Sequence, residues 1–273
     1  MRRIALIAVS LLTLLLFAGC TGNLFMEWDK PEVPSVSEIN NKDVTSSSGA
    51  NDFLDEVEDW DDSDVLQGDT EKSVATVDKL REIYENGGLD IETRQKAAAL
   101  AGEIAIESDP NAETLTKKLV GELGNLTDTS TTDTATLLTN LVPEEVRDDE
   151  QAFTAMVNTL LNAADSYLIF GDNLDPDDDG VLDYGNDSFM SDGEFGDTVQ
   201  RAGTSVAIMA AVDVLDSSPG DGIAGADGIS ALFSIISSDT PTWSDDNPID
   251  YFESNSAYDG MANILEASGL SFS

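Results

Sequence analysis

Apolar residues recur at helical spacing along most of this chain after residue 70. Within the expected helices they stand three or four positions apart, which is the period of a helix with one buried face. The expected helices span 73–88, 92–108, 110–126, 134–142, 143–170 (as one helix or two), 193–217, 225–238 and 256–270. We find no convincing alternation with the period of two that a half-buried strand shows. The pattern predicts an all-α domain over residues 71–273, either a multi-helix bundle or an array of helix pairs.

Local signals mark where several of these helices begin and end. Asp90 is expected to cap the helix that follows it, and Asp109 with Pro110 indicates a stop and a restart. Gly87 and Gly88 are expected to end the preceding helix. The residues expected to face the core are Val74, Val77, Leu80, Ile83 and Tyr84, then Ala97, Leu100, Ala101, Ile104 and Ala105, and later Val199, Ala202, Val206, Met209, Ala210 and Val214.

Residues 20–70 have a different character, because low hydrophobicity and high charge make a packed core hard to form. We therefore expect a disordered, acidic tether between the chain's beginning and its helical domain. Phe53, Val57 and Trp60 leave an alternative open, since their spacing fits a short helix docked on the domain.

The first nineteen residues resemble the leader of a bacterial lipoprotein. Arg2 and Arg3 precede the apolar run Ile4–Phe17, which is shorter than the roughly 20 residues that a membrane span needs. Gly19 and Cys20 then match the end of a lipobox. The resemblance implies that Cys20, the only cysteine, carries a diacylglycerol after the leader 1–19 is removed. The alternatives are an uncleaved anchor helix, or a plain signal peptide with an incidental cysteine.

Two details of the leader refine this expectation. Phe17 stands where the usual lipobox has leucine, and this looser form resembles spirochaete lipoproteins. Thr21 follows the cysteine where an aspartate would retain a Gram-negative lipoprotein at the inner membrane. The resemblance thus implies a cell-envelope location at the outer rather than the inner membrane, and leaves the periplasmic or surface face open.

The amino-acid composition limits which partners and which kinds of active or metal site we expect. The chain has 54 acidic and 13 basic residues and a formal net charge of −41, so nucleic acid is not an expected partner. It contains no histidine, which removes the commonest general base and the commonest transition-metal ligand. Arg201 is the only basic residue between 151 and 273.

The segment 171–193 contains the clearest chemical motif. Three alternating aspartates precede Gly180, as in the calcium loop D-x-[DN]-x-[DN]-G, where alternation lets carboxylates converge on one hard cation. The twelfth position is Asn186 and not the glutamate of an EF-hand, so the segment resembles the broader DxDxDG class. The expected ligands of a structural Ca²⁺ are Asp175, Asp177, Asp179, the carbonyl of Val181, Asp183 and Asp187. The alternative is an acidic surface loop without metal.

Two weaker features concern recognition. Trp243, Tyr251 and Phe252 lie in an Asp-rich segment and could line a partner surface or belong to a small satellite core. The turn at 105–113 resembles the junction between tetratricopeptide repeats, although no 34-residue repeat is visible.

Together these observations favour a lipid-anchored, non-enzymatic protein of the cell envelope. Its helical body would bind an envelope protein partner or act as a spacer, and a structural calcium loop would support it. A solute-binding or transporter-associated lipoprotein is the first alternative, and it would require a closed apolar cavity. A hydrolase that uses the carboxylates of 175–187 is the second.

Overall fold

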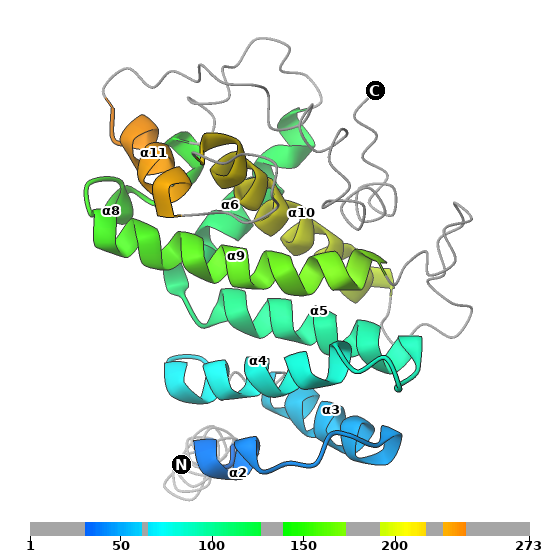
Figure 1. Cartoon of the computed structure of the whole chain (residues 1–273). Helices are drawn as coiled ribbons and strands as arrows, with labels where there is room; N and C mark the ends of the chain where they lie inside the picture. Colours follow the sequence, from blue (N-terminus) through cyan, green and yellow to red (C-terminus); the bar gives the residue numbers. More distant parts are fainter. Residues whose placement is uncertain (1–30, 62–64, 127–138, 173–191, 217–225, 239–273) are drawn as a thin grey trace, which may run out of the picture.

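The computed structural model describes residues 31–61, 65–126, 139–172, 192–216 and 226–238. Within them every regular element is an α-helix, which confirms the predicted all-α fold (Figure 1). The helices are α2 (Val36–Asn40), α3 (Ser47–Asp61), α4 (Thr70–Tyr84), α5 (Ile91–Glu107), α6 (Pro110–Leu126), α8 (Glu144–Arg147), α9 (Glu150–Asp172), α10 (Asp192–Leu215) and α11 (Ala226–Ile236). None of the described helices is both long and apolar enough to cross a bilayer.

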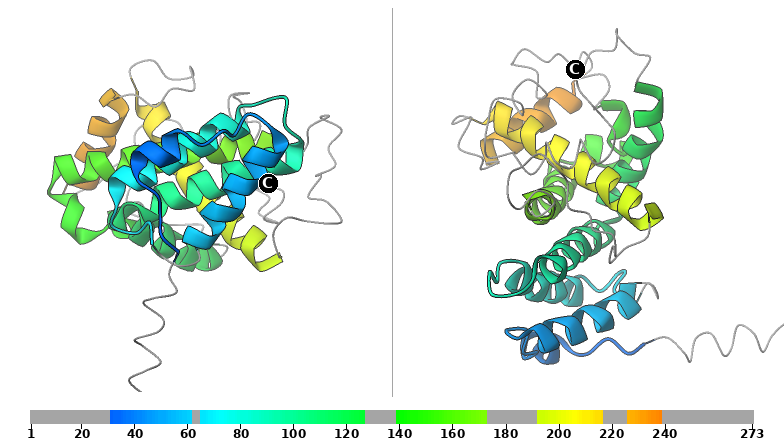
Figure 2. Two further views of the ribbon diagram at one scale, coloured as in Figure 1. Left: turned by 90° about the horizontal axis from the view of Figure 1, so that it is seen from below. Right: turned by 90° about the vertical axis from the view of Figure 1, so that its right-hand side faces the viewer.

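The helices form a stack that follows the chain with one excursion. α2 and α3 lie at one end, α4, α5 and α9 follow as successive neighbours, and α10 packs beyond α9 with α6 and α11 (Figures 1 and 2). α5 and α9 share the most extensive contact, although α6 and α8 separate them in the chain. α11 crosses α10 so closely that a Cβ on Gly228 would lie 2.1 Å from the carbonyl oxygen of Val212.

The expectation of a flexible tether over residues 20–70 is wrong for the described part of that segment. α2 begins with a capping box in which Ser35 and Glu38 satisfy each other's backbone amides. α3 buries five apolar side chains almost completely, and two of them, Phe53 and Trp60, meet edge to face with ring centroids 6.0 Å apart. The docked helix that the spacing of Phe53, Val57 and Trp60 allowed is therefore confirmed.

The acidic residues of α3 explain why the segment's average composition was misleading. All of them except Asp61, at the end of the helix, occupy the outer face of an amphipathic helix, and neighbouring lysines pair with several of them. Lys96 of α5 lies 2.8 Å from Glu58, and Lys42 lies 2.6 Å from Glu56. Charge averaged over the segment conceals this division into two faces.

α5 is the centre of the stack, and its small residues let helices approach from several sides. All five residues expected to face inward from this helix are buried. The predicted caps are also confirmed, because the carboxylate of Asp90 accepts the backbone N–H of Thr93, and that of Asp109 accepts the N–H groups of Asn111 and Ala112.

For one residue of α4, Val74, the prediction that it faces the core is wrong. Val74 is 53% exposed, whereas Val77, Leu80, Ile83 and Tyr84 are buried as expected. The buried face of α4 uses Ser73 and Thr76 in its first turns, and the hydroxyl of Ser73 donates to the carbonyl of Leu66. A polar side chain whose hydrogen bond is local can thus replace an apolar one on the buried face.

Candidate functional site

The residues that the sequence singled out for chemistry lie outside the described residues. This holds for the lipidation candidate Cys20, for the calcium ligands Asp175, Asp177, Asp179, Val181, Asp183 and Asp187, and for the aromatic residues Trp243, Tyr251 and Phe252. The structure places only the flanks of the Asp-rich segment, with α9 ending at Asp172 and α10 beginning at Asp192. Among the described residues, no group of three or more acidic or cysteine side chains is arranged to hold a metal ion.

The structure instead brings together four polar side chains from three helices, which we call the polar centre: Glu103 and Glu107 of α5, Tyr167 of α9 and Arg201 of α10. The two glutamates are four residues apart and therefore share a face of α5. Arg201 Nη1 lies 2.5 Å from Glu103 Oε1 and 3.0 Å from Glu107 Oε1, so one nitrogen joins α10 to both carboxylates.

The ion pairs of the polar centre are only partly exposed. The side chain of Arg201 is 24% exposed and that of Glu107 17% exposed. Burial disfavours the charge on the guanidinium, but the neighbouring groups, with Glu103 foremost, outweigh that effect and raise the pKa of Arg201. The arginine therefore stays cationic at any physiological pH.

Tyr167 closes the polar centre from α9. Its ring lies directly over Gly102, where an added Cβ would come within 2.5 Å of Cζ. The side chain is fully buried, and its hydroxyl has no hydrogen-bond partner within the described part of the chain. Burial, followed by the nearby Glu103, raises the pKa of Tyr167 well above 10.0, so the phenol stays protonated.

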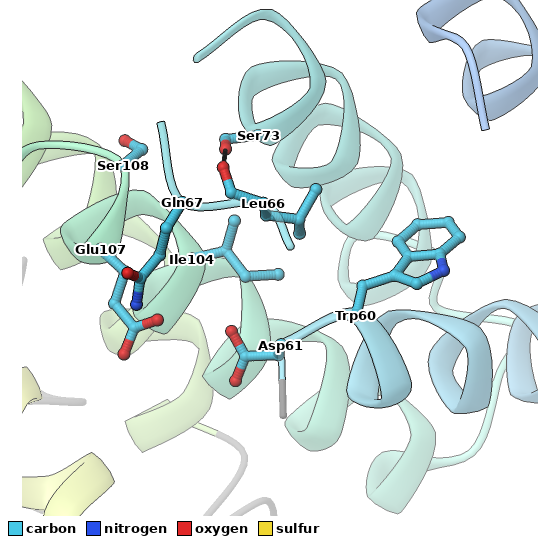
Figure 3. Close-up of a pocket in the computed structure, with 8 residues that line it drawn as sticks. All are labelled: Trp60, Asp61, Leu66, Gln67, Ser73, Ile104, Glu107 and Ser108. Carbon is cyan, nitrogen blue, oxygen red and sulfur yellow. Dashed lines mark hydrogen bonds between the residues drawn. The ribbon is translucent and has the colours of Figure 1, made fainter. Parts of the chain in front are cut away.

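A small polar cavity lies on one side of Glu107, between α3, α4 and α5. Its volume is about 10 Å³, which is enough for one water molecule. Figure 3 shows the Gln67 amide and the Glu107 carboxylate turned toward each other, with the Asp61 carboxylate facing the same space from the end of α3. The Trp60 ring points away from these polar groups.

A larger cleft opens where Arg201 lies, and we call it the Arg201 cleft. Its volume is about 230 Å³, and α5, α6 and α10 form its walls. The lining residues are Ile106, Glu113, Thr116, Lys117, Asp197, Gln200 and Arg201. Glu107 borders the small cavity and its ion-pair partner Arg201 borders the cleft, so one ion pair joins the linings of the two spaces.

A second polar chain links α4 to α9 across α5. Arg81 Nε donates to the Tyr84 hydroxyl at 3.1 Å, and that hydroxyl lies 3.4 Å from Ser166 Oγ. Burial disfavours the cationic form of Arg81, but the bond to Tyr84 is the largest influence and raises its pKa. This series of hydrogen bonds ties α4 to α9. Unlike the polar centre, it borders no cleft described above.

Sequence reasoning noticed Arg201 only as an isolated positive charge. Its partners are nearly a hundred positions earlier in the chain, so no local spacing could have indicated the pairing. The one sequence feature that could have indicated an ion pair at Arg201 is its isolation, because a lone cation in a very acidic region has many possible anionic partners.

Comparison with known proteins adds no relative. No family model, curated protein or solved structure matches this chain.

Proposed function

We propose that this chain is a lipid-anchored protein of the cell envelope, at the outer membrane, whose helical body binds a partner protein or acts as a spacer without catalysing a reaction. The observation that carries the proposal is the order of features in the leader: Arg2 and Arg3, the apolar run Ile4–Phe17, then Gly19 and Cys20. A lipid on Cys20 would supply the membrane attachment, since each buried methylene contributes about 0.8 kcal/mol and two or more chains hold stably.

The charge of the chain supports attachment through lipid alone. With a net charge of −41 the protein is repelled by anionic lipid headgroups, so electrostatic adsorption would oppose membrane binding. The same charge favours a partner that presents basic residues.

The non-catalytic role rests on the residues available for chemistry. The sequence has no histidine, and its one cysteine is the proposed lipid site. In the polar centre, Arg201 forms ion pairs with both glutamates, and the Tyr167 phenol stays protonated. These properties suit a structural or binding role better than proton transfer at neutral pH.

A structural Ca²⁺ in the segment 175–187 is the second part of the proposal. The segment joins α9 to α10, which pack against each other in the stack. A cation held there by Asp175, Asp177, Asp179, Val181, Asp183 and Asp187 would neutralise close carboxylates and stabilise that helix pair.

The anchor is tested by metabolic labelling with radioactive palmitate in cells that express the full chain or Cys20→Ser. We expect label and membrane fractionation for the native chain and loss of both in the variant. Equal labelling and equal fractionation of the two chains would contradict the anchor.

The calcium site is tested by thermal melts of the purified full chain with and without excess Ca²⁺ at matched ionic strength. Specific binding stabilises the folded state by mass action, so the midpoint should rise by several degrees. Asp177→Asn with Asp179→Asn should remove the shift. A shift no larger than that produced by NaCl would refute a specific site.

A further inference from the structure

The Arg201 cleft combines a partly buried cation, an exposed anion (Asp197) and a partly buried anion (Glu113) in one space. We propose that this cleft binds a small amphoteric solute with one carboxylate and one ammonium group, of which free α-amino acids are the simplest class. The proposal depends neither on the lipid anchor nor on the calcium loop, so each can fail without the others.

Arg201 supplies the carboxylate-binding side. Both of its ion pairs use Nη1, and the structure gives Nε and Nη2 no acceptor among the described residues. These two groups form a donor edge of the guanidinium, which matches the two oxygens of a carboxylate. The glutamates already fix the orientation of the side chain, so little conformational entropy is lost when a ligand binds.

Asp197 supplies the ammonium-binding side. It stands four residues before Arg201 on α10, so the two residues share a face with their Cβ atoms about 5–6 Å apart. Its carboxylate is exposed and forms no ion pair within the described residues. Glu113, the other anion of the cleft, is already paired with Lys117.

The charge balance decides between a zwitterion and a simple ion. Glu103 and Glu107 stand behind Arg201, so a purely anionic ligand would add a third negative charge beside one guanidinium. A purely cationic ligand would lie near both Arg201 and Lys117. A ligand that carries both charges satisfies Arg201 and Asp197 together.

Size and polarity point to a small molecule. The volume of about 230 Å³ lies below the range of about 300–1,000 Å³ that is typical of drug-sized ligands. Ile106 lines the cleft but is only 1% exposed, so it leaves little apolar surface and only a short ligand side chain fits beside it. Gln200 is exposed and offers an amide donor and acceptor at the rim.

The binding test uses the full chain purified in mild detergent and saturation-transfer NMR with a pool of the standard amino acids. The amino acids that bind are then compared with the matching carboxylic acid without the amine and the matching amine without the carboxylate. We expect at least one amino acid to bind tenfold more tightly than either of its halves. If every dissociation constant exceeds about 10 mM, or if one half binds as well as the whole, the proposal is wrong.

Two matched variants locate the binding. Asp197→Asn should weaken amino-acid binding at least tenfold and leave the circular dichroism spectrum and melting temperature unchanged, because the residue is exposed. Asp52→Asn removes an equally exposed carboxylate from α3 and should leave binding unchanged. Unaltered binding in Asp197→Asn, or an equal loss in Asp52→Asn, would remove the ligand from this cleft.

Discussion

Replacement of Phe53 by alanine tests whether the acidic segment before residue 70 belongs to the folded body. Phe53 is 1% exposed in α3, and its ring meets Trp60 edge to face. If the segment were only a tether, the substitution would change no packed contact and the stability would stay the same. If α3 packs as the structure describes, the variant leaves a cavity beneath the helix.

The expected loss follows from burial. Truncation of a buried phenylalanine to alanine costs about 3–5 kcal/mol, which combines the lost transfer free energy with the cavity left behind. For a body of this size, each kcal/mol lowers the melting temperature by about 2–4 °C, so the midpoint should fall by roughly 6–20 °C. The loss of the contact between the Phe53 and Trp60 rings is already included in the expected cost of about 3–5 kcal/mol.

The assay is urea and thermal denaturation of the full chain followed by circular dichroism at neutral pH. Val74→Ala is the matched control, because it also truncates an apolar helix residue but at a position that is 53% exposed. The control should change stability by no more than about 0.5 kcal/mol, as surface substitutions usually do. A loss below about 1 kcal/mol in Phe53→Ala would refute the packing of α3.

Three further predictions concern single groups inside the stack, each measured by urea denaturation of the full chain. Gly102→Ala should lower the free energy of unfolding by about 1–3 kcal/mol, because the added Cβ would come 2.5 Å from the Tyr167 ring. Gly196→Ala is the control and should not lower it, since a Cβ there meets no atom within 4 Å. Equal effects of the two substitutions would contradict the close approach of Tyr167 to Gly102. Tyr167→Phe should raise stability by about 1 kcal/mol at pH 7, because the buried hydroxyl has no partner within the described residues. The folded-state pKa of Tyr167 lies well above 10.0, so the native chain should also lose stability as the pH rises above 10.0, and Tyr167→Phe should lose less. If Tyr167→Phe is instead less stable than the native chain at pH 7, the hydroxyl is hydrogen-bonded and the reasoning is wrong. Asp90→Ala should cost about 1 kcal/mol at neutral pH through loss of the α5 cap. Since its bond to the Thr93 N–H lowers the pKa of Asp90 below 3.8, the native advantage should disappear as the pH falls through the folded-state value; an advantage that persists in strong acid would exclude the carboxylate as its source.

Local features of the fold were predictable because each depends on neighbours in the chain. Asp90 and Asp109 were recognised as caps from the residues beside them, and the buried face of α5 followed from its period. Val74 was misplaced because the first turns of α4 bury Ser73 and Thr76, whose polarity hides them from a hydrophobic pattern.

The polar centre was beyond such reasoning, since it depends on how distant helices pack. Glu103 and Arg201 meet because α10, which packs on α9, also lies beside α5 in the stack. The error over α3 had another cause: averaged charge indicated disorder where the arrangement of the same residues indicated an amphipathic helix. The calcium and lipid sites stay predictions, because both lie outside the described residues.

If the chain is anchored as proposed, the capping box at Ser35 limits how far the folded body can lie from the membrane. An extended chain advances at most about 3.3–3.6 Å per residue, so under the proposed anchor the stretch from Cys20 to Ser35 spans no more than about 50 Å. A tether that ran to residue 70 would have allowed more than three times that reach. The α2–α3 end of the stack must then remain near the lipid headgroups, and a partner would have to come to the membrane to meet it.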